Sequence, residues 1–271
     1  MKRQGTRLIA AACFTLGLGL SGNAHAVWSF ANSGSNTTFT DSGVSVTLSA
    51  VYATNATFSG SGTWAAATLT DQGSYGKGIC SANDSSGTPC NSPDHAIDNN
   101  VNTEAVLLNF SSSVSLSSIG IGWTYTTNSD ISLFRWTGTG TPTGNPTALI
   151  GQDANSMTGW ELVGNYGDIN TDTSNPYNLV NSTGKGSSWW FISAYNSGYA
   201  ATAGETRLGT GNVALDNGND YFKLYAIAGS KCTSTTPGQC GPTNKTPEPG
   251  SLALASFALL GVIAARRRSA K

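Results

Sequence analysis

The chain has 271 residues, and its formal charge of −1 hides an uneven distribution of charged residues. Seven of the 14 basic residues flank the apolar runs near the two ends, which leaves seven against all 15 acidic residues in between. The middle of the chain therefore has a formal charge of −8 (seven minus 15), and such a charge repels phosphate backbones. We expect no nucleic-acid binding.

Residues 1–26 have the three parts of a secretory signal peptide. Basic residues come first, an apolar run from Leu8 to Leu20 follows, and Ala24 and Ala26 form an Ala-x-Ala cleavage site. This pattern predicts export by the general secretion machinery and removal of the segment.

Residues 27–228 are predicted to form one all-β domain. Short runs rich in Val, Ile, Thr and aromatic residues alternate with turn-forming segments, and few stretches show a helical period. Residues 44–52 alternate between apolar and polar, as a strand with one buried face does. The other expected strands are 105–110, 114–123 (two strands or one bulged strand), 131–136, 160–163, 189–195 and 221–228.

Such a set of strands favours a two-sheet sandwich of the jelly-roll or the discoidin and galactose-binding-like kind. Two sheets bury one face of each strand and leave the Ser/Thr face in water. A right-handed β-solenoid ranks lower, because no fixed repeat period is seen. Trp189 and Trp190 must point to opposite faces of a strand that they share. We favour core packing for one ring and cover by a loop for the other.

The cysteines that follow the signal are four, and an even number in an exported chain indicates disulfides, because the compartment beyond the inner membrane is oxidising. Three pairings are compatible with the sequence. We favour Cys80 with Cys90 and Cys232 with Cys240, because each pair closes a short loop of small and polar residues. Metal binding by the thiols is the weaker alternative, since no Cys-x-x-Cys occurs and only His95 could join them.

The sequence shows no recognisable catalytic constellation, so we expect the protein not to be an enzyme. His95 has no Gly-x-Ser-x-Gly nucleophile to serve, and we expect it to join Asp94 and Asp98 in a polar cluster that fixes the start of the strand at 105–110. Most carboxylates stand beside Gly, Asn or Ser, where they cap backbone N–H groups. A secreted glycan-processing hydrolase is the alternative, because 15 acidic residues leave room for a carboxylate pair.

Two acidic segments are calcium candidates, and calcium is the only cofactor that we consider. Asp168, Asn170 and Asp172 have the spacing that opens a calcium loop, but the Gly of position six and the Glu of position twelve are both replaced. An EF-hand is therefore excluded, and an irregular loop site stays open. The second candidate is Asp-Asn-Gly-Asn-Asp at 216–220, and both segments also fit Asx turns.

Residues 229–246 are expected to be a flexible linker, and residues 247–271 a membrane-directed tail. The tail begins with Pro247, Glu248 and Pro249, continues with an apolar run at 251–265, and closes with Arg266, Arg267 and Arg268. Fifteen helical residues span roughly 22 Å, which is short of the bilayer's hydrocarbon thickness. The expected single C-terminal membrane helix is therefore a marginal anchor, with the arginines on the cytoplasmic side.

This order of residues resembles the tripartite PEP-CTERM tail. The resemblance implies a Gram-negative bacterium and an exosortase partner, a membrane-embedded protease or transpeptidase that cuts near Pro247, Glu248 and Pro249. Cutting would release or transfer the body of the protein to the cell surface or the medium. The prolines keep the cut segment extended, since Pro lacks an N–H and disfavours helix in the residue before it.

A second resemblance, to the XDP-type exosortase-dependent surface proteins, covers the middle of the chain. Its segments are 95–99, 104–110, 122–123, 130–132, 159–160 and 193–196. It implies a delivery route and no activity. We therefore expect an exported surface or extracellular-matrix protein with a structural or adhesive role. Its aromatic, Ser/Thr-rich surface would contact exopolysaccharide in a biofilm matrix.

Overall fold

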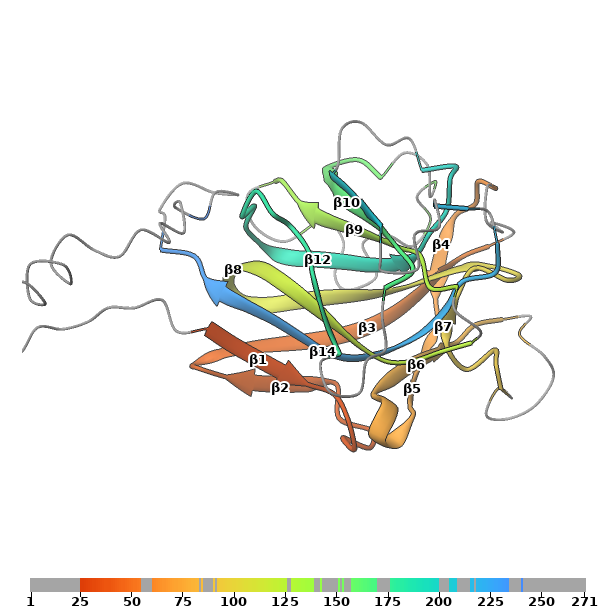
Figure 1. The fold of residues 1–271 in the computed structure, drawn as a ribbon, viewed down its shortest axis with the longest axis horizontal. Coiled ribbons are helices and arrows are strands. Elements are labelled where there is room, and N and C mark those ends of the chain that lie inside the picture. Colours follow the sequence, from red (N-terminus) through yellow and green to blue (C-terminus); the bar gives the residue numbers. More distant parts are fainter. Residues whose placement is uncertain are drawn as a thin grey trace, which may run out of the picture.

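The computed structural model describes most of the central region and leaves out both ends of the chain. The described residues are 25–54, 60–82, 84, 90, 92–125, 128–138, 142, 151, 153, 157–169, 176–199, 205–208, 215–216, 218–233 and 240. Within them the fold is nearly all β, with one short 3₁₀ helix, η1 (Gly73–Tyr75), and no α-helix. The expected all-β class is confirmed (Figure 1).

The strands belong to one large sheet that folds back on itself, consistent with a β-sandwich (Figure 1). They are β1 (His25–Ser29), β2 (Thr38–Asp41), β3 (Val44–Ala53), β4 (Trp64–Ala66), β5 (Thr68–Asp71), β6 (Lys77–Cys80), β7 (Ile97–Asp98), β8 (Thr103–Thr124), β9 (Ile131–Trp136), β10 (Trp160–Gly167), β11 (Tyr177–Leu179), β12 (Ser187–Ala194), β13 (Glu205–Leu208) and β14 (Tyr221–Lys231).

The long strand β8 joins the two layers. Its first half pairs with β3 and β12, and beyond β12 the sheet continues through β9 and β10 to the edge strand β13. Its second half pairs with β14 and β11, and β14 also pairs with β1, β6 and β7. The register with β14 shifts at several points, so residues 114–123 belong to one bulged strand. Because β8 turns back along the molecule, Thr103 and Thr124 lie at the same end.

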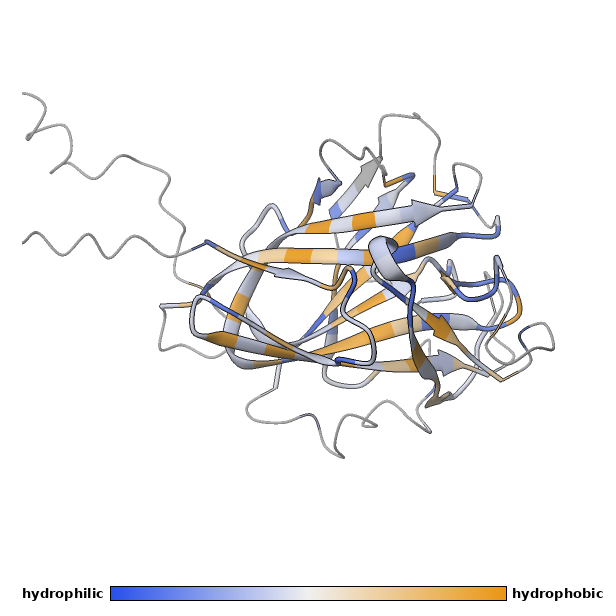
Figure 2. Ribbon diagram, turned by 90° about the horizontal axis from the view of Figure 1, so that it is seen from below, coloured by the Kyte–Doolittle hydropathy of each residue, from blue (hydrophilic) through white to orange (hydrophobic). Residues whose placement is uncertain are grey.

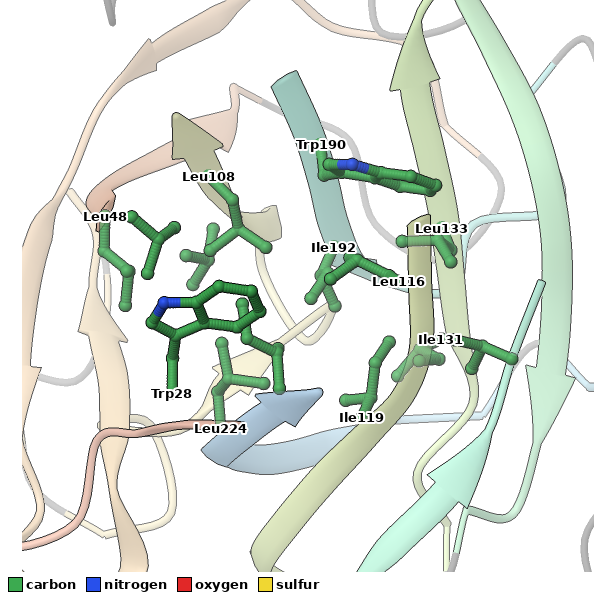
Figure 3. Close-up of a cluster of buried hydrophobic side chains, with 14 of the residues drawn as sticks. Trp28, Leu48, Leu108, Leu116, Ile119, Ile131, Leu133, Trp190, Ile192 and Leu224 are labelled. Atoms are coloured by element: carbon green, nitrogen blue, oxygen red, sulfur yellow. The ribbon is translucent and has the colours of Figure 1, made fainter. Parts of the chain in front are cut away.

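The main core lies between the two layers. Trp28, Leu48, Leu108, Trp190 and Leu224 meet there from five different strands (Figure 3). Apolar residues alternate with polar ones along several strands (Figure 2), and in the first part of β3 the buried positions alternate with more exposed ones. This alternation is the period-two signal that predicted β3.

A second apolar cluster covers the outer face of the layer that contains β12. Trp64, Leu107, Trp189 and Phe191 lie in it, and Met157 and Tyr199 pack onto it from connecting segments. Trp190 belongs to the main core, so the two neighbouring tryptophans do point to opposite faces. Both rings are buried, at 4% and 0% exposed. Each ring therefore packs in a hydrophobic cluster, and cover of Trp189 by a loop stays a prediction.

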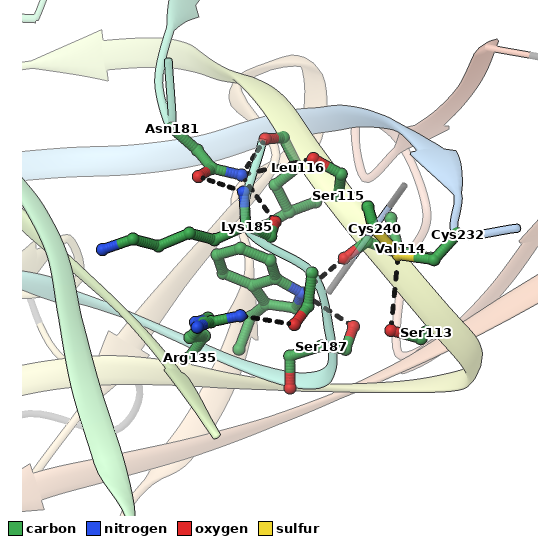
Figure 4. The surroundings of a disulfide bond; sticks show 12 residues. Ser113, Val114, Ser115, Leu116, Arg135, Asn181, Lys185, Ser187, Cys232 and Cys240 are labelled. Carbon is green, nitrogen blue, oxygen red and sulfur yellow. Dashed lines mark hydrogen bonds between the residues drawn. A yellow bond between two sulfur atoms is a disulfide. The ribbon is translucent and has the colours of Figure 1, made fainter. Parts of the chain in front are cut away.

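The two expected disulfides are present. Cys80 pairs with Cys90, and Cys232 pairs with Cys240. Cys232 follows β14, and its backbone N–H donates to the Ser113 carbonyl at the bend of β8. The Ser113 hydroxyl also donates to Cys232 Sγ (Figure 4). The second disulfide thus lies against the sandwich. Strand β14 runs to Lys231, so its last three residues lie inside the segment that was expected to be linker.

Strand β1 begins at His25, inside the segment that was expected to be signal peptide. Ala26 pairs with Gly229 and is 2% exposed. Removal of residues 1–26 would leave Val27 to Ser29 of this strand. Residues 1–24 and the expected membrane helix at 251–265 lie outside the described residues. Among the residues that are described, no helix is long and apolar enough to cross a membrane.

Candidate functional site

Polar and aromatic groups gather at one end of the sandwich. Both ends of β8, the short strand β7, the start of β14 and the η1 turn lie there, and the C-terminal end of β14 points to the opposite end (Figure 1). Since Lys223 and Lys231 are eight residues apart on one strand, roughly 25 Å separates this end from the exit toward the tail.

His95 is held by two contacts at this end. Its Nδ1 lies 3.3 Å from the carbonyl oxygen of Cys90, and its Nε2 lies 2.9 Å from Nζ of Lys223. An ammonium can only donate, so Nε2 accepts and Nδ1 carries the proton that it donates to Cys90. Burial, and then the Lys223 charge, lower the pKa of His95. An imidazole whose two ring nitrogens are both hydrogen-bonded within the protein fits the expected structural role.

An exposed aromatic face surrounds the same lysine. Lys223 Nζ lies 4.4 Å from the ring centre of Trp123 and 5.4 Å from that of Tyr75, both within cation–π range. Tyr125 follows β8 and its ring centre is 6.2 Å from that of Trp123. Tyr75 and Tyr125 are each 47% exposed. We call Tyr75, Trp123 and Tyr125 the aromatic face.

Two buried carboxyl groups lie at the same end of the sandwich, where Asp98 pairs with Tyr221 at the start of β14. Asp98 and Glu104 are 2% and 0% exposed. The backbone N–H of Asp98 donates to Glu104 Oε2 over 3.3 Å, and the backbone N–H of Asn100 donates to Asp98 Oδ1 over 3.0 Å. The remaining oxygens, Asp98 Oδ2 and Glu104 Oε1, have no hydrogen-bond partner in the structure. Burial raises the pKa of each carboxyl well above its usual range, and neighbouring carboxylates raise it further. The hydrogen bond from the Asn100 N–H opposes the shift at Asp98.

Asp84 is the third carboxyl group of this cluster. It accepts hydrogen bonds from the backbone N–H and the hydroxyl of Ser81, and Asn102 holds the same turn by donating to the Ser81 hydroxyl and the Ala82 carbonyl. Cys80, Asp84 and Cys90 lie close enough to share a metal ion. The two sulfurs are bonded to each other, so they offer no thiolate ligand.

A second acidic group forms around Asp130. Its Oδ1 accepts from the backbone N–H of Asp168 and its Oδ2 from that of Asp216. The first residues of the two calcium candidates, Asp168 and Asp216, therefore both contact Asp130, which neither sequence motif includes. Asn170 and Asp172 lie outside the described residues, and so does Asn217. Burial raises the pKa of Asp130 to about 6, although its two backbone hydrogen bonds oppose the shift.

Asn99 connects the two acidic groups. It donates through Nδ2 to Asp220 Oδ2 over 2.6 Å, and its Oδ1 accepts from the backbone N–H of Asp220. Asp220 Oδ1 in turn accepts from the backbone N–H of Asp130. Burial and the neighbouring Asp130 charge raise the pKa of Asp220 to about 9. This shift favours the neutral acid at pH 7.

Sequence reasoning located part of this end. It predicted a cluster of Asp94, His95 and Asp98, and the Asp94 charge does act on both His95 and Asp98, but it missed Glu104, Lys223 and Tyr75 at the same end. Glu104 had one usable signal, a charged residue that opens an otherwise apolar strand. Lys223 and Tyr75 had none, because their proximity depends on the pairing of β14 with β8 and on the packing of η1.

The comparisons with known proteins concern the tail. The PEP-CTERM protein-sorting motif matches residues 245–268. This segment begins shortly after Cys240 and contains Pro247, Glu248, Pro249 and the three arginines. No curated protein and no solved structure matches the chain. The resemblance of residues 95–196 to XDP-type proteins stays a prediction. The motif implies exosortase as a processing partner and export through the membrane, so the chain is a PEP-CTERM sorting-signal protein.

Proposed function

We propose that the protein is a non-catalytic surface or extracellular-matrix component of a Gram-negative bacterium that contacts exopolysaccharide through the aromatic face. The observation that carries the proposal is the exposure of Tyr75 and Tyr125 beside Trp123, at the end of the sandwich away from the C-terminal end of β14 (Figure 1). A sorted protein that is held by its tail would present this end outward.

The aromatic face has the chemistry that sugar rings require. Large flat side chains offer apolar area with little conformational freedom to lose, and the C–H face of a pyranose ring can pack on them. Lys223 lies under the rings with its amine directed at Trp123 and His95. It fixes the indole from below and places a positive charge near hydroxyl and carboxylate groups of a bound polysaccharide.

Replacing Tyr125 by alanine is expected to lower the affinity for the producing cell's own exopolysaccharide at least tenfold, because one stacking ring of the face is removed. Trp123→Ala should act in the same direction. Binding would be measured by affinity electrophoresis and by a glycan array. Leu179→Ala is the matched control, since Leu179 is 65% exposed and lies on β11. Equal binding by all three variants and the parent would contradict the proposal.

The alternative, a glycan-processing hydrolase, makes a different prediction. Its acid would have to be reached by substrate, whereas Asp98 and Glu104, the carboxyl pair with strongly raised pKa values, are at most 2% exposed. This burial supports the non-catalytic proposal. Turnover of matrix polysaccharide by the purified protein, abolished by Glu104→Gln, would favour the hydrolase instead.

Exosortase processing is expected to remove the basic end of the tail. The intact mass of protein from the surface or medium fraction should correspond to a C-terminus near Pro249, and the membrane fraction should contain a form that retains Arg266 to Lys271. Replacing Pro247, Glu248 and Pro249 with alanine should shift all of the protein to the longer, membrane-bound mass. The longer mass in every fraction of wild-type cells would instead indicate a plain membrane-anchored protein.

A further inference from the structure

We propose that Asp41 binds the new N-terminal amine that signal-peptide removal creates at Val27, and so locks the shortened strand β1 into the sandwich. The cut after Ala26 is the one expected from the sequence, and glycan contact plays no part in this lock. In the structure the backbone N–H of Val27 donates to Asp41 Oδ2 over 2.6 Å. The residue that the Ala-x-Ala motif makes the first of the mature chain is therefore already held by a carboxylate.

The pairing of β1 with β14 leaves the Val27 N–H free for this contact. Successive backbone N–H groups of a strand point to opposite sides, and the N–H of Phe30 donates to the Tyr225 carbonyl on the β14 side. The N–H of Val27, three residues earlier, therefore points away from β14. Strand β2, which contains Asp41, lies on that side and pairs only with β3. A side chain of β2 reaches the Val27 N–H in place of a backbone carbonyl.

A tight hairpin fixes Asp41 at the end of β2. Ser42 and Gly43 connect β2 to β3, and their φ angles are 47° and 74°, both positive, as a type I′ turn requires. Asp41 pairs with Val44 across this turn, and the Val44 carbonyl accepts from Trp28 Nε1 over 2.9 Å. The same hairpin therefore holds two successive residues of β1.

Signal-peptide cleavage changes the charge of the contact. Hydrolysis of the Ala26–Val27 bond consumes one water, whose hydroxyl joins the Ala26 carbonyl carbon and whose proton joins the Val27 nitrogen. The amine takes one further proton at neutral pH, because the pKa of an α-amino group lies above neutrality. The contact between a neutral N–H and the Asp41 carboxylate thereby becomes an ion pair, which adds the attraction between two opposite charges.

The ion pair replaces contacts that cleavage removes. In the uncut chain His25 and Ala26 also pair with β14, and His25 Nε2 lies 3.1 Å from the Ser117 hydroxyl. Cleavage takes these contacts away and leaves Val27 as a free end beside the C-terminal end of β14 (Figure 1). The next residue, Trp28, is 1% exposed in the main core. A chain end frays unless it is tied down, so the ion pair keeps this indole in place.

The surroundings of Asp41 suit an ammonium group. The three ion pairs that the described residues form with lysine or arginine all involve other carboxylates, so no side-chain cation competes for Asp41 among them. Val27 is 39% exposed. Asp41 accepts one N–H of the new ammonium group, and water can solvate the others. The charge is therefore paired without being buried.

The test uses protein recovered from the surface or medium fraction of the producing cells, and its intact mass should place the N-terminus at Val27. Asp41→Asn keeps the shape of the side chain and removes its charge. This variant should melt about 1–3 °C lower, and an aminopeptidase should release Val27 from it about two- to fivefold faster. In NMR titrations the pKa of the Val27 α-amino group should be higher in the wild type than in Asp41→Asn, because a neighbouring carboxylate favours the charged form.

Two control variants separate the ion pair from the backbone contact. Insertion of Ser-Gly between Ala26 and Val27 keeps the cleavage motif and makes the Val27 nitrogen an amide again, so Asp41→Asn should cost less stability in this background. Asp216→Asn changes an exposed carboxylate close to the start of β14 and should leave the aminopeptidase rate unchanged. A mature N-terminus at any residue other than Val27 would overturn the proposal. Equal losses from Asp41→Asn with and without the insertion would also overturn it and show that Asp41 serves only a neutral N–H.

Discussion

Trp190→Ala is expected to lower the free energy of unfolding by about 3–5 kcal/mol, the usual cost of deleting a fully buried aromatic side chain. Trp190 is 0% exposed and lies between the two layers with Leu133, Leu116 and Ile192 (Figure 3). The cavity would be large because rigid strands surround it and cannot collapse into it. Urea unfolding followed by tryptophan fluorescence would measure the change.

The indole of Trp190 also carries two hydrogen bonds that the variant would lose. Nε1 donates to the Val114 carbonyl over 3.2 Å and to the Ser187 carbonyl over 3.0 Å. Trp190→Phe keeps most of the volume and removes these bonds, so it should cost roughly 1–2 kcal/mol. Tyr125→Ala, at an exposed ring, should change stability by less than about 0.5 kcal/mol. Similar losses in Trp190→Ala and Tyr125→Ala would contradict the placement of Trp190 in the core.

The protein is expected to become less stable as pH rises from 5 to 8, and Asp220 is one cause of the loss. The pKa of this carboxyl is raised from 3.8 to about 9 on folding, so the folded chain holds a proton that the unfolded chain has lost. Its stabilising contribution is complete below the unfolded pKa and disappears as pH passes through about 9. The slope between these limits is about −1.4 kcal/mol per pH unit.

Over the three units from pH 5 to pH 8, Asp220 alone accounts for a loss on the order of 4 kcal/mol. Asp130, whose pKa is raised to about 6, adds to the loss at the acidic side of this range. Unfolding in urea would be measured at each pH in the presence of EGTA, so that bound calcium does not neutralise carboxylates. Asp220→Asn should reduce the slope by about 1.4 kcal/mol per pH unit, because it replaces one titrating acid with a neutral amide.

Asp216→Asn is the control for this series. Asp216 is exposed, and its side chain accepts from Gly218 N and Asn128 Nδ2, so its removal should leave most of the slope in place. Stability that is constant from pH 5 to pH 8 would show that Asp220 is ionised in the folded protein. The same slope in Asp220→Asn would assign the effect to Asp98 and Glu104, whose pKa values are raised in the same direction.

The sequence predicted those strands that can be recognised from their own residues, without knowledge of their neighbours in the sheet. Residues 44–53 and 131–136 form strands almost as expected, because side-chain alternation and β-branched residues are local properties. The short strands β4, β6, β7 and β13 were missed. Each has two to four residues, too few to show a period, and they exist because a longer neighbour offers backbone hydrogen bonds.

In the candidate site, too, contacts between residues close in sequence could be predicted, and contacts between distant residues could not. The pairings Cys80–Cys90 and Cys232–Cys240 were predicted because both partners lie close in sequence. The contact of Asp168 and Asp216 with Asp130 was not predicted, because the three residues are separated along the chain by 38 to 86 positions. Only the return of β8 and the pairing of β14 with it bring such residues to one end of the molecule.

The sequence by itself determined how the protein is delivered. The PEP-CTERM tail acts as a linear signal, so its order of prolines, apolar residues and arginines is sufficient. The tertiary structure decided which side chains meet, including the exposed aromatic face beside Lys223 and the buried carboxyl groups at the same end of the sandwich. The physical reason is that burial, and therefore pKa and exposure, depends on strand pairing between distant segments, which no local pattern of residues specifies.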